Sequence, residues 1–265
     1  MRGSILQVKA QGCSGRFLII NADDFGLTDG VSQGIAESLA SGTVSSTTAM
    51  LCAPGSQKRI EKWIECLRGR VGVHLQLTGG RPISPVADVP SLVGSDEHFY
   101  RSASDIDPLF EDVVVEWRSQ VERLRELGLQ PTHLDTHHHV HRHPVAFAGV
   151  LAVAEHYDLP VRTLSETMTD RIRARGVRCS DKTILEFYGA PPLEKVLSLL
   201  DSAFETAPCT VELMCHPGIV NDDLRRTSSY VDERGRELTM LNSPDFLSEV
   251  AARNIEIVKS WAVLR

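Results

Sequence analysis

The stretch FLIINADDFG, residues 17–26, joins an apolar run to two adjacent carboxylates and a glycine. Residues 17–22, which begin with the apolar run FLII, predict a buried β-strand, because a short apolar run that ends at polar residues is typical of a strand covered on both faces. Residues 30–41 continue with a helical pattern, for which Asp29 is a candidate N-cap and Gly42 a candidate stop. A buried strand followed by a helix indicates an α/β fold.

The same alternation continues along the chain. We expect further strands over residues 44–51, 71–77, 132–136, 160–163, 210–215 and 255–257. We expect further helices over residues 57–67, 107–127, 143–156, 193–204 and 244–252. Alternating strands and helices predict a mostly parallel sheet with helices packed outside it, and about seven strands suit either an open sheet or an irregular barrel.

The length of 265 residues fits one or two domains. Neither an internal repeat nor a linker is visible in the sequence, so we expect one domain over residues 16–265 behind a loose N-terminal tail of residues 1–15. Two long irregular stretches, near residues 78–105 and 217–242, are predicted to interrupt the alternation. Loops of that length commonly cover a functional site.

Composition excludes several classes of protein. The formal net charge of −7 argues against a nucleic-acid partner, because phosphate binding needs a concentrated positive field. The apolar runs are far shorter than the ~20 residues of a membrane span. The 6 cysteines show no CxxC spacing, and the N-terminus lacks the apolar segment of a secretory signal, so we expect reduced thiols and a cytoplasmic location. Exposed apolar faces on the helices of Trp63 and Trp117 would indicate a homodimer.

Unusual residues follow the expected strands directly, where catalytic groups collect in parallel α/β folds. Asp23 and Asp24 end the first strand, and adjacent carboxylates repel each other unless a cation lies nearby. A metal ion could bind one of them and leave the other as a base, whereas the alternative is a polar turn in which Asp24 caps a helix. His74 ends another strand, and alone it could equally be a core residue.

The run THLDTHHHVH, residues 132–141, holds five of the 10 histidines. In extended backbone His133, Asp135, His137, His139 and His141 would share one face, although the alternation can fail beyond the end of the strand. A surface histidine tract does not normally follow a buried strand, so the run favours metal binding or catalysis. Asp135 could accept a hydrogen bond from a ligand imidazole.

Glu212, Met214 and His216 share a strand face before Pro217, so Cys215 would point away from His216. His216 is a candidate general acid, and the alternative is a histidine that anchors a loop.

Asp24, His74 and His137 together make a two-histidine, one-carboxylate set, which leaves coordination positions open for water and substrate. His139 or His141 could replace one of these ligands. The donors suit Zn²⁺, and such sites also hold Mg²⁺ or Mn²⁺.

Five motifs in register resemble the YdjC-like carbohydrate deacetylases, which include the chitooligosaccharide deacetylases. The motifs are residues 19–27, 46–50, 72–75, 132–141 and 212–218, and the resemblance runs from about residue 17 to residue 246. A weaker match continues over residues 228–230 and 236–238. The resemblance implies an irregular β/α barrel related to the NodB-like polysaccharide deacetylases.

The resemblance also implies a reaction and a set of site residues. The reaction is hydrolysis of an N-acetyl group on an amino sugar, with release of acetate. The family binds a divalent metal, often magnesium, at residues that match His74 and His137, and Asp24 completes the set. Asp23 matches the proposed base and His216 the proposed acid, while Arg162 sits where the NodB-like enzymes place an arginine that orients the base.

Two other functions are compatible with these residues. A metal-dependent phosphoesterase would use a similar set, but it should also place Lys or Arg in the same loops to hold phosphate. The motifs around the site contain neither, although Arg162 or Arg81 could approach from elsewhere. The other function is that of a non-catalytic relative that binds a metal or a sugar, against which the presence of Asp23 and His216 counts.

Overall fold

The computed structural model describes residues 15–206 and 209–264. The expected N-terminal tail of residues 1–15 therefore lies, apart from Gly15, outside the described residues. The described strands form one parallel sheet in the order β4-β3-β2-β1-β6-β5, in which β7 also pairs with β1. The strands are β1 (Arg16–Phe25), β2 (Ser46–Ala49), β3 (Val71–Leu75), β4 (Leu134–Thr136), β5 (Lys182–Ile184), β6 (Thr210–Cys215) and β7 (Ile255–Ile257).

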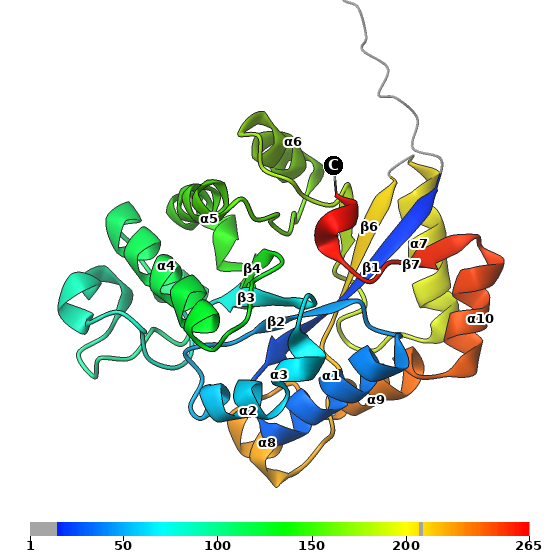
Figure 1. The fold of residues 1–265 in the computed structure, drawn as a ribbon, viewed down its shortest axis with the longest axis horizontal. Coiled ribbons are helices and arrows are strands. Elements are labelled where there is room, and N and C mark those ends of the chain that lie inside the picture. The colour runs from blue at the N-terminus through cyan, green and yellow to red at the C-terminus, as the bar shows by residue number, and fades with distance from the viewer. Residues whose placement is uncertain (1–14, 207–208, 265) are drawn as a thin grey trace, which may run out of the picture.

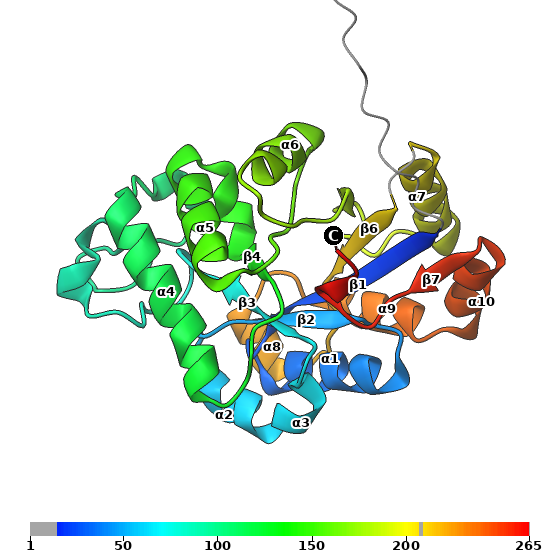
Figure 2. The ribbon, with the colours of Figure 1, turned by 45° about the horizontal axis from the view of Figure 1, so that its top comes forward.

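Helices surround the curled sheet on its outer side (Figure 1). They are α1 (Asp29–Ser41), α2 (Ser56–Lys62), α3 (Ile64–Leu67), α4 (Phe110–Glu126), α5 (Pro144–Tyr157), α6 (Glu166–Ala174), α7 (Leu193–Glu205), α8 (Asp222–Thr227), α9 (Asp232–Leu241) and α10 (Pro244–Ala252). The pair α4 and α5 flanks β3 and β4, whereas α7 and α10 lie at the far side near β7, as both ribbon views show (Figure 2). The expected α/β class with parallel strands is confirmed.

An extended segment, residues 160–162, helps to close the sheet into an irregular barrel. Leu134 of β4 donates its N–H to the carbonyl of Pro160 at 2.8 Å, and its own carbonyl accepts the N–H of Arg162 at 3.0 Å. On the other side, the N–H of Val161 donates to the carbonyl of Arg178 at 2.9 Å, in the chain that leads to β5. The strand expected over residues 160–163 is thus reduced to a single bridge between Leu134 and Val161.

The two faces of β1 contact different parts of the molecule, the main hydrophobic core on one face and the barrel interior on the other. Leu18, Ile20 and Ala22 belong to the main hydrophobic core, which includes residues of the helices. Because successive residues of a strand point to opposite faces, Ile19 and Asn21 point the other way, into the barrel. Ile19 packs there in a smaller apolar cluster with Trp261. The interior of the barrel therefore changes from apolar at the start of β1 to polar at its carboxyl end.

Trp261 forms the floor of the barrel interior. It lies in a 3₁₀ turn, Trp261–Val263, and its ring stacks on His133 with 4.1 Å between the ring centroids. Its indole N–H donates to the hydroxyl of Ser46 at 2.9 Å. Above it, Nε2 of His133 lies 2.9 Å from Oδ1 of Asn21, so polar contacts continue from this floor towards the carboxyl ends of the strands.

Several local expectations need correction. Thr28, not Asp29, caps α1, because its hydroxyl accepts the N–H of Val31 at 3.2 Å. Gly42 ends α1 with a φ of 80°, as expected. The helix expected over residues 57–67 breaks at Trp63 into α2 and α3.

The irregular stretch expected near residues 217–242 instead contains α8 and α9. The side chain of Asn221 starts α8 by accepting the N–H of Leu224 at 2.9 Å. Both α6 and β5 are absent from the sequence-based expectations. Residues 78–105 are irregular apart from three short 3₁₀ turns, as expected.

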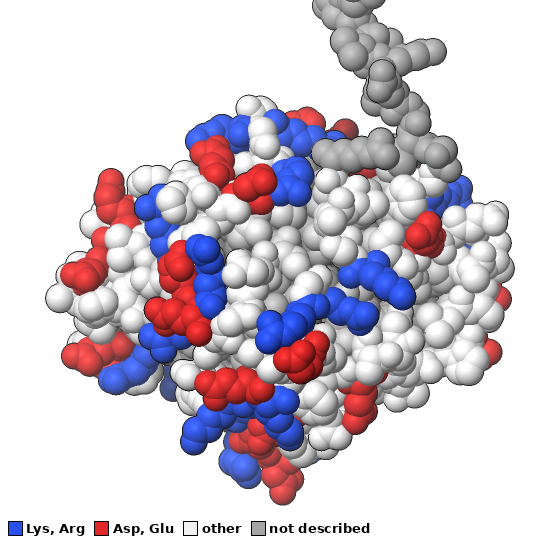
Figure 3. Space-filling model, viewed as in Figure 1, with Lys and Arg blue, Asp and Glu red and all other residues white. Residues whose placement is uncertain are grey.

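The distribution of surface charge, the burial of two tryptophans and the character of the helices test the expectations about nucleic acid, a second copy of the chain and a membrane. Basic and acidic side chains are interspersed over the face drawn in Figure 3. Trp117 is fully buried and Trp63 packs against the core. Within residues 15–206 and 209–264, none of the helices combines the length and the apolar character that crossing a lipid bilayer requires.

Gly72 in β3 is predicted to be essential to the packing of the interior. A Cβ atom at this position would lie 2.7 Å from two ring atoms of His133 and would also meet its carbonyl oxygen. Gly72→Ala should therefore lower the free energy of unfolding by about 2 kcal/mol, as overpacking of a core does. Urea unfolding followed by circular dichroism measures the loss. Gly94→Ala, at a half-buried loop position, is the control and should change it by less than about 0.5 kcal/mol.

Candidate active site and metal centre

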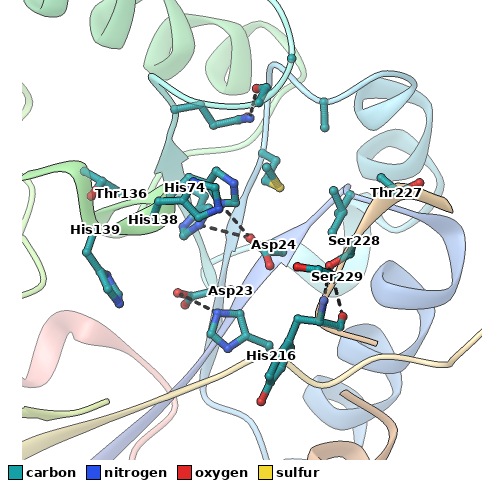
Figure 4. Close-up of a pocket in the computed structure, with 18 of the residues that line it drawn as sticks. Asp23, Asp24, His74, Thr136, His138, His139, His216, Thr227, Ser228 and Ser229 are labelled. Atoms are coloured by element: carbon teal, nitrogen blue, oxygen red, sulfur yellow. Dashed lines mark hydrogen bonds and ion pairs between the residues drawn. The ribbon is translucent and has the colours of Figure 1, made fainter. Parts of the chain in front are cut away.

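A cavity of about 970 Å³ opens at the carboxyl ends of the strands. Asp23, Asp24, His74, His137 and His216 all line it, although they come from four separate stretches of the chain. Arg162 does not line the cavity but lies beneath it, fully buried. The structure thus brings the nominated residues together at one end of the sheet, and Figure 4 shows Asp23, Asp24, His74 and His216 among them.

A bulge at the end of β1 places two consecutive carboxylates in the same cavity. In a regular strand Asp23 and Asp24 would point to opposite faces. The register of β1 with β2 shifts between Ala22 and Phe25, and Asp24 has a φ of 71°. A left-handed conformation costs a residue other than glycine about 1–3 kcal/mol, and it is retained where the surrounding structure requires it. Asp24 therefore belongs to the cavity and does not cap a helix.

Asp24, His74 and His137 form a group of three possible metal ligands. Oδ1 of Asp24 lies 3.3 Å from Nε2 of His74 and 3.5 Å from Nδ1 of His137. The three donor atoms all lie within 4.8 Å of one another. Oδ1 of Asp24 is buried and, among the described residues, has no hydrogen-bond partner, which a bound cation would supply. One carboxylate oxygen and two imidazole nitrogens therefore fit a divalent cation.

The expected contact between Asp135 and the imidazole of His74 is present in the structure. Oδ1 of Asp135 lies 2.7 Å from Nδ1 of His74, and its other oxygen accepts the hydroxyl of Thr48 at 2.9 Å. Such a contact fixes the ring and directs Nε2 at the cavity. Burial opposes the charged form of His74, but Asp135 raises its pKa to about 10, so a cation that binds Nε2 has to displace a proton.

A second group of donors, Asp23, His74 and Asp135, also lies close enough to share an ion. Both carboxylates of that group are already paired with Arg162. Oδ1 of Asp24 has no such partner among the described residues, so the group around Asp24 is the better candidate for a metal.

Arg162 contacts three carboxylates in the buried polar interior. Its guanidinium binds Asp23 through two hydrogen bonds of 2.6 and 2.7 Å, and its Nε donates to Glu212 at 2.7 Å. Nη1 also lies 3.0 Å from Asp135. Burial alone would raise the pKa of Asp23, but the ion pair with Arg162 outweighs this and holds the pKa well below its usual range. Asp23 is therefore ionised at neutral pH and fixed in orientation.

His216 lies beside Asp23 in the cavity. Its Nε2 lies 3.9 Å from Oδ2 of Asp23 (Figure 4). Its backbone N–H donates to Glu237 of α9, a carboxylate that also accepts the hydroxyl of Tyr230. Burial lowers the pKa of His216 to about 4, even though Asp23 and Asp24 favour its charged form. The imidazole is therefore neutral at neutral pH.

The remaining histidines of the run over residues 132–141 leave the expected pattern. Strand geometry ends at Thr136, and His138 and His139 follow with φ values of 54° and 50°. His141 is buried beside Thr136. Neither His139 nor His141 belongs to a group of three possible ligands within the described residues, so neither replaces a proposed ligand in this structure.

Sequence reasoning missed two residues of the cavity. Arg234 of α9 donates to Oδ2 of Asp24 at 2.6 Å. Tyr188, 56% exposed, lines the cavity beside His216. The signal for Arg234 was the spacing of Arg234 and Glu237, which puts both residues on one face of a helix, within a stretch that was expected to be irregular.

The chain is similar to known proteins over nearly its whole length. A family model of YdjC-like proteins matches residues 17–252. A carbohydrate deacetylase of Geobacillus stearothermophilus is 36% identical over 245 residues, which cover 92% of this chain and 96% of that protein. A carbohydrate deacetylase of Vibrio cholerae serotype O1 (strain ATCC 39541 / Classical Ogawa 395 / O395) is 34% identical over 254 residues, which cover 93% of this chain and 96% of that protein.

Solved structures give a consistent result. A candidate cellobiose-phosphate cleavage protein of Enterococcus faecalis V583 is 33% identical and superposes with a TM-score of 0.86, covering 95% of this chain and 100% of that chain. A lactam utilization protein of Thermus thermophilus, 14% identical with a TM-score of 0.51, covers 91% of this chain and 99% of that chain and shares the fold alone. The prediction from the five motifs is confirmed: the chain belongs to the family of YdjC-like proteins.

Proposed function

We propose that the protein is a metal-dependent carbohydrate deacetylase, which hydrolyses an N-acetyl group of an amino sugar and releases acetate. One observation carries the proposal: the donors of Asp24, His74 and His137 lie directly beside a second carboxylate, Asp23, that Arg162 holds in place. The names of the two carbohydrate deacetylases, 36% and 34% identical to this chain, support the same reaction. The cation would be Mg²⁺ or Zn²⁺.

Asp23 is proposed as the base that takes a proton from the attacking water. Its low pKa keeps it ionised but limits its strength as a base. A cation held by Asp24, His74 and His137 would polarise the amide carbonyl and make the water more acidic, which offsets this limit. The fixed orientation of Asp23 by Arg162 means that the carboxylate needs little rearrangement during the reaction.

His216 is proposed as the acid that protonates the departing amine. A neutral imidazole has to receive a proton before it can act in this way. Oδ2 of Asp23, 3.9 Å from Nε2 of His216, is the neighbour that can pass on the proton taken from water. The C–N bond then breaks as the amine takes that proton, and the products are acetate and a free amino sugar.

The cavity favours a substrate larger than a single sugar. Its volume of about 970 Å³ is at the upper end of the range for ligand pockets. Tyr188 stacks on Tyr230 with 4.1 Å between ring centroids, and the hydroxyl of Tyr230 accepts the N–H of Gly189 at 2.6 Å. The result is a fixed aromatic surface on which the C–H face of a sugar ring can pack. We propose an oligosaccharide or glycoconjugate that contains N-acetylglucosamine.

A phosphoesterase is the less favoured alternative. Arg162 donates to Asp23 and Glu212, and it lies beneath the cavity, so its guanidinium is not free to hold a phosphate. Arg81 is paired with Glu97 on the surface.

A cytoplasmic location and a homodimer also stay proposals. Cell fractionation would test the location, and light scattering would test the homodimer.

The proposed ligands predict the metal content of variants. His74→Ala and His137→Ala should each reduce bound metal from about one ion per chain to almost none after gel filtration, because two remaining donors cannot hold a cation firmly. Elemental analysis measures the metal, and circular dichroism checks the fold. His98→Ala, at an exposed histidine paired with Asp96, is the control. Full metal content in both ligand variants would refute this site.

Asp23→Asn should lower kcat for acetate release from N,N′-diacetylchitobiose by about 10²–10⁴-fold, because the amide cannot act as the base. Metal content should stay unchanged, since Asp23 is not a proposed ligand. Acetate is measured by mass, and phosphate release from p-nitrophenyl phosphate is measured in parallel. Wild-type kcat in the variant would contradict the role of Asp23. Faster phosphate than acetate release by the wild type would favour the phosphoesterase.

Tyr188→Ala should raise KM for a chitooligosaccharide roughly tenfold and leave kcat almost unchanged, because stacking contributes equally to the bound substrate and the transition state. Tyr188→Phe, which keeps the ring, should behave like the wild type. Steady-state kinetics with acetate detection separates the two constants. An unchanged KM in the alanine variant would show that the sugar does not pack on this ring.

A further inference from the structure

Arg234 is a buried cation in direct contact with one of the proposed metal ligands. The residue is 3% exposed, and its Nη2 donates to Oδ2 of Asp24 at 2.6 Å. Its Nε donates to the backbone carbonyl of Tyr230 at 3.1 Å. Its own backbone carbonyl accepts the N–H of Gly218 at 3.2 Å. The guanidinium is therefore fixed against a single oxygen of Asp24.

The two oxygens of Asp24 have different surroundings as a result. Oδ2 accepts the arginine, whereas Oδ1 faces His74 and His137 at 3.3 and 3.5 Å. The hydrogen bond from the arginine occupies one lone pair of Oδ2 and reduces its basicity, so a cation is expected to bind Oδ1 instead. Coordination through one oxygen leaves more positions open for water and substrate than coordination through both.

The pair also affects the charge of the centre. Asp24 and Arg234 together carry no net charge, and imidazole ligands bind a metal in their neutral form. A positive charge separated from the cation by a single carboxylate repels it, and burial prevents solvent from screening that repulsion. Arg234 should therefore weaken the binding of the cation and leave more of its charge to polarise a substrate.

We propose that Arg234 is a positioning residue with two effects. It restricts Asp24 to coordination through one oxygen. It also lowers the affinity of the site for the cation, and the bound cation then polarises the substrate more strongly. The proposal rests on the metal-dependent reaction proposed above. The proposal predicts that metal binding becomes tighter when Arg234 is neutralised. Loss of a residue that merely orients a ligand has the opposite effect and typically weakens metal binding by about 10- to 100-fold.

The test compares metal affinity in variants of Arg234. Protein stripped of metal by a chelator is titrated with Zn²⁺ alone and with Mg²⁺ alone at one fixed pH, by calorimetry or against a coloured chelator. Arg234→Gln should bind each metal about tenfold more tightly than the wild type, because one repelling charge is lost. Its kcat for acetate release at saturating metal should fall by about tenfold or more. Arg234→Lys, which keeps the charge, should bind metal within about threefold of the wild type.

Arg236→Gln is the matched control. Arg236 lies two positions away on α9, is exposed and pairs with Glu233, so this variant should match the wild type in both measurements. If Arg234→Gln does not fold, Arg234→Met removes the same charge and is expected to show the same tighter binding.

Unchanged or weaker metal binding in the neutral variant, or a wild-type kcat in that variant at saturating metal, would overturn the proposal. If the wild type releases no acetate from any sugar, the proposed function fails, and the order of metal affinities still decides the role of Arg234.

Discussion

The structure of the site depends on one buried cation, Arg162, that joins three carboxylates. Asp23 belongs to β1, Asp135 to β4 and Glu212 to β6. In the strand order β4 and β6 lie on either side of β1, so a single guanidinium contacts strands from both halves of the sheet. All four side chains are almost completely buried. Removing one member of such a cluster leaves an uncompensated charge in a dry interior, which typically costs about 3–5 kcal/mol. The cluster therefore holds the carboxyl ends of the strands at fixed relative positions.

The site above this cluster combines regular and irregular backbone. β3 and β4 bring His74 and Asp135 together by ordinary parallel register. The bulge at Asp24 and the left-handed residues after Thr136 then direct further side chains into the cavity. Regular strands thus supply a rigid base, and local strain is confined to the residues that face the cavity, as is common at functional sites.

Much of this arrangement could be predicted from the sequence because it follows from strand periodicity. The strand over residues 210–215 was predicted with its correct bounds, and Met214 and His216 both line the cavity, as expected for residues of one strand face. The bulge was not predictable, since nothing local in the pair Asp23 and Asp24 indicates a break in the alternation. The contact between Arg234 and Asp24 joins residues far apart in the chain, and the polar helix α9 carries a weak apolar pattern. The family could be predicted because five motifs occur in the same order as in its members, whereas single residues within each motif stayed ambiguous.

The stacking of Trp261 on His133 has a consequence for the order of folding. All described strands of the sheet precede Trp261 in the sequence. Ile19 of β1 packs against Trp261, although nearly the whole chain separates the two residues. Until the segment of Trp261 docks, this indole does not cover the ring of His133. Contacts between such distant segments form late and slowly. Completion of the barrel floor therefore depends on a contact between two segments that are distant in the sequence.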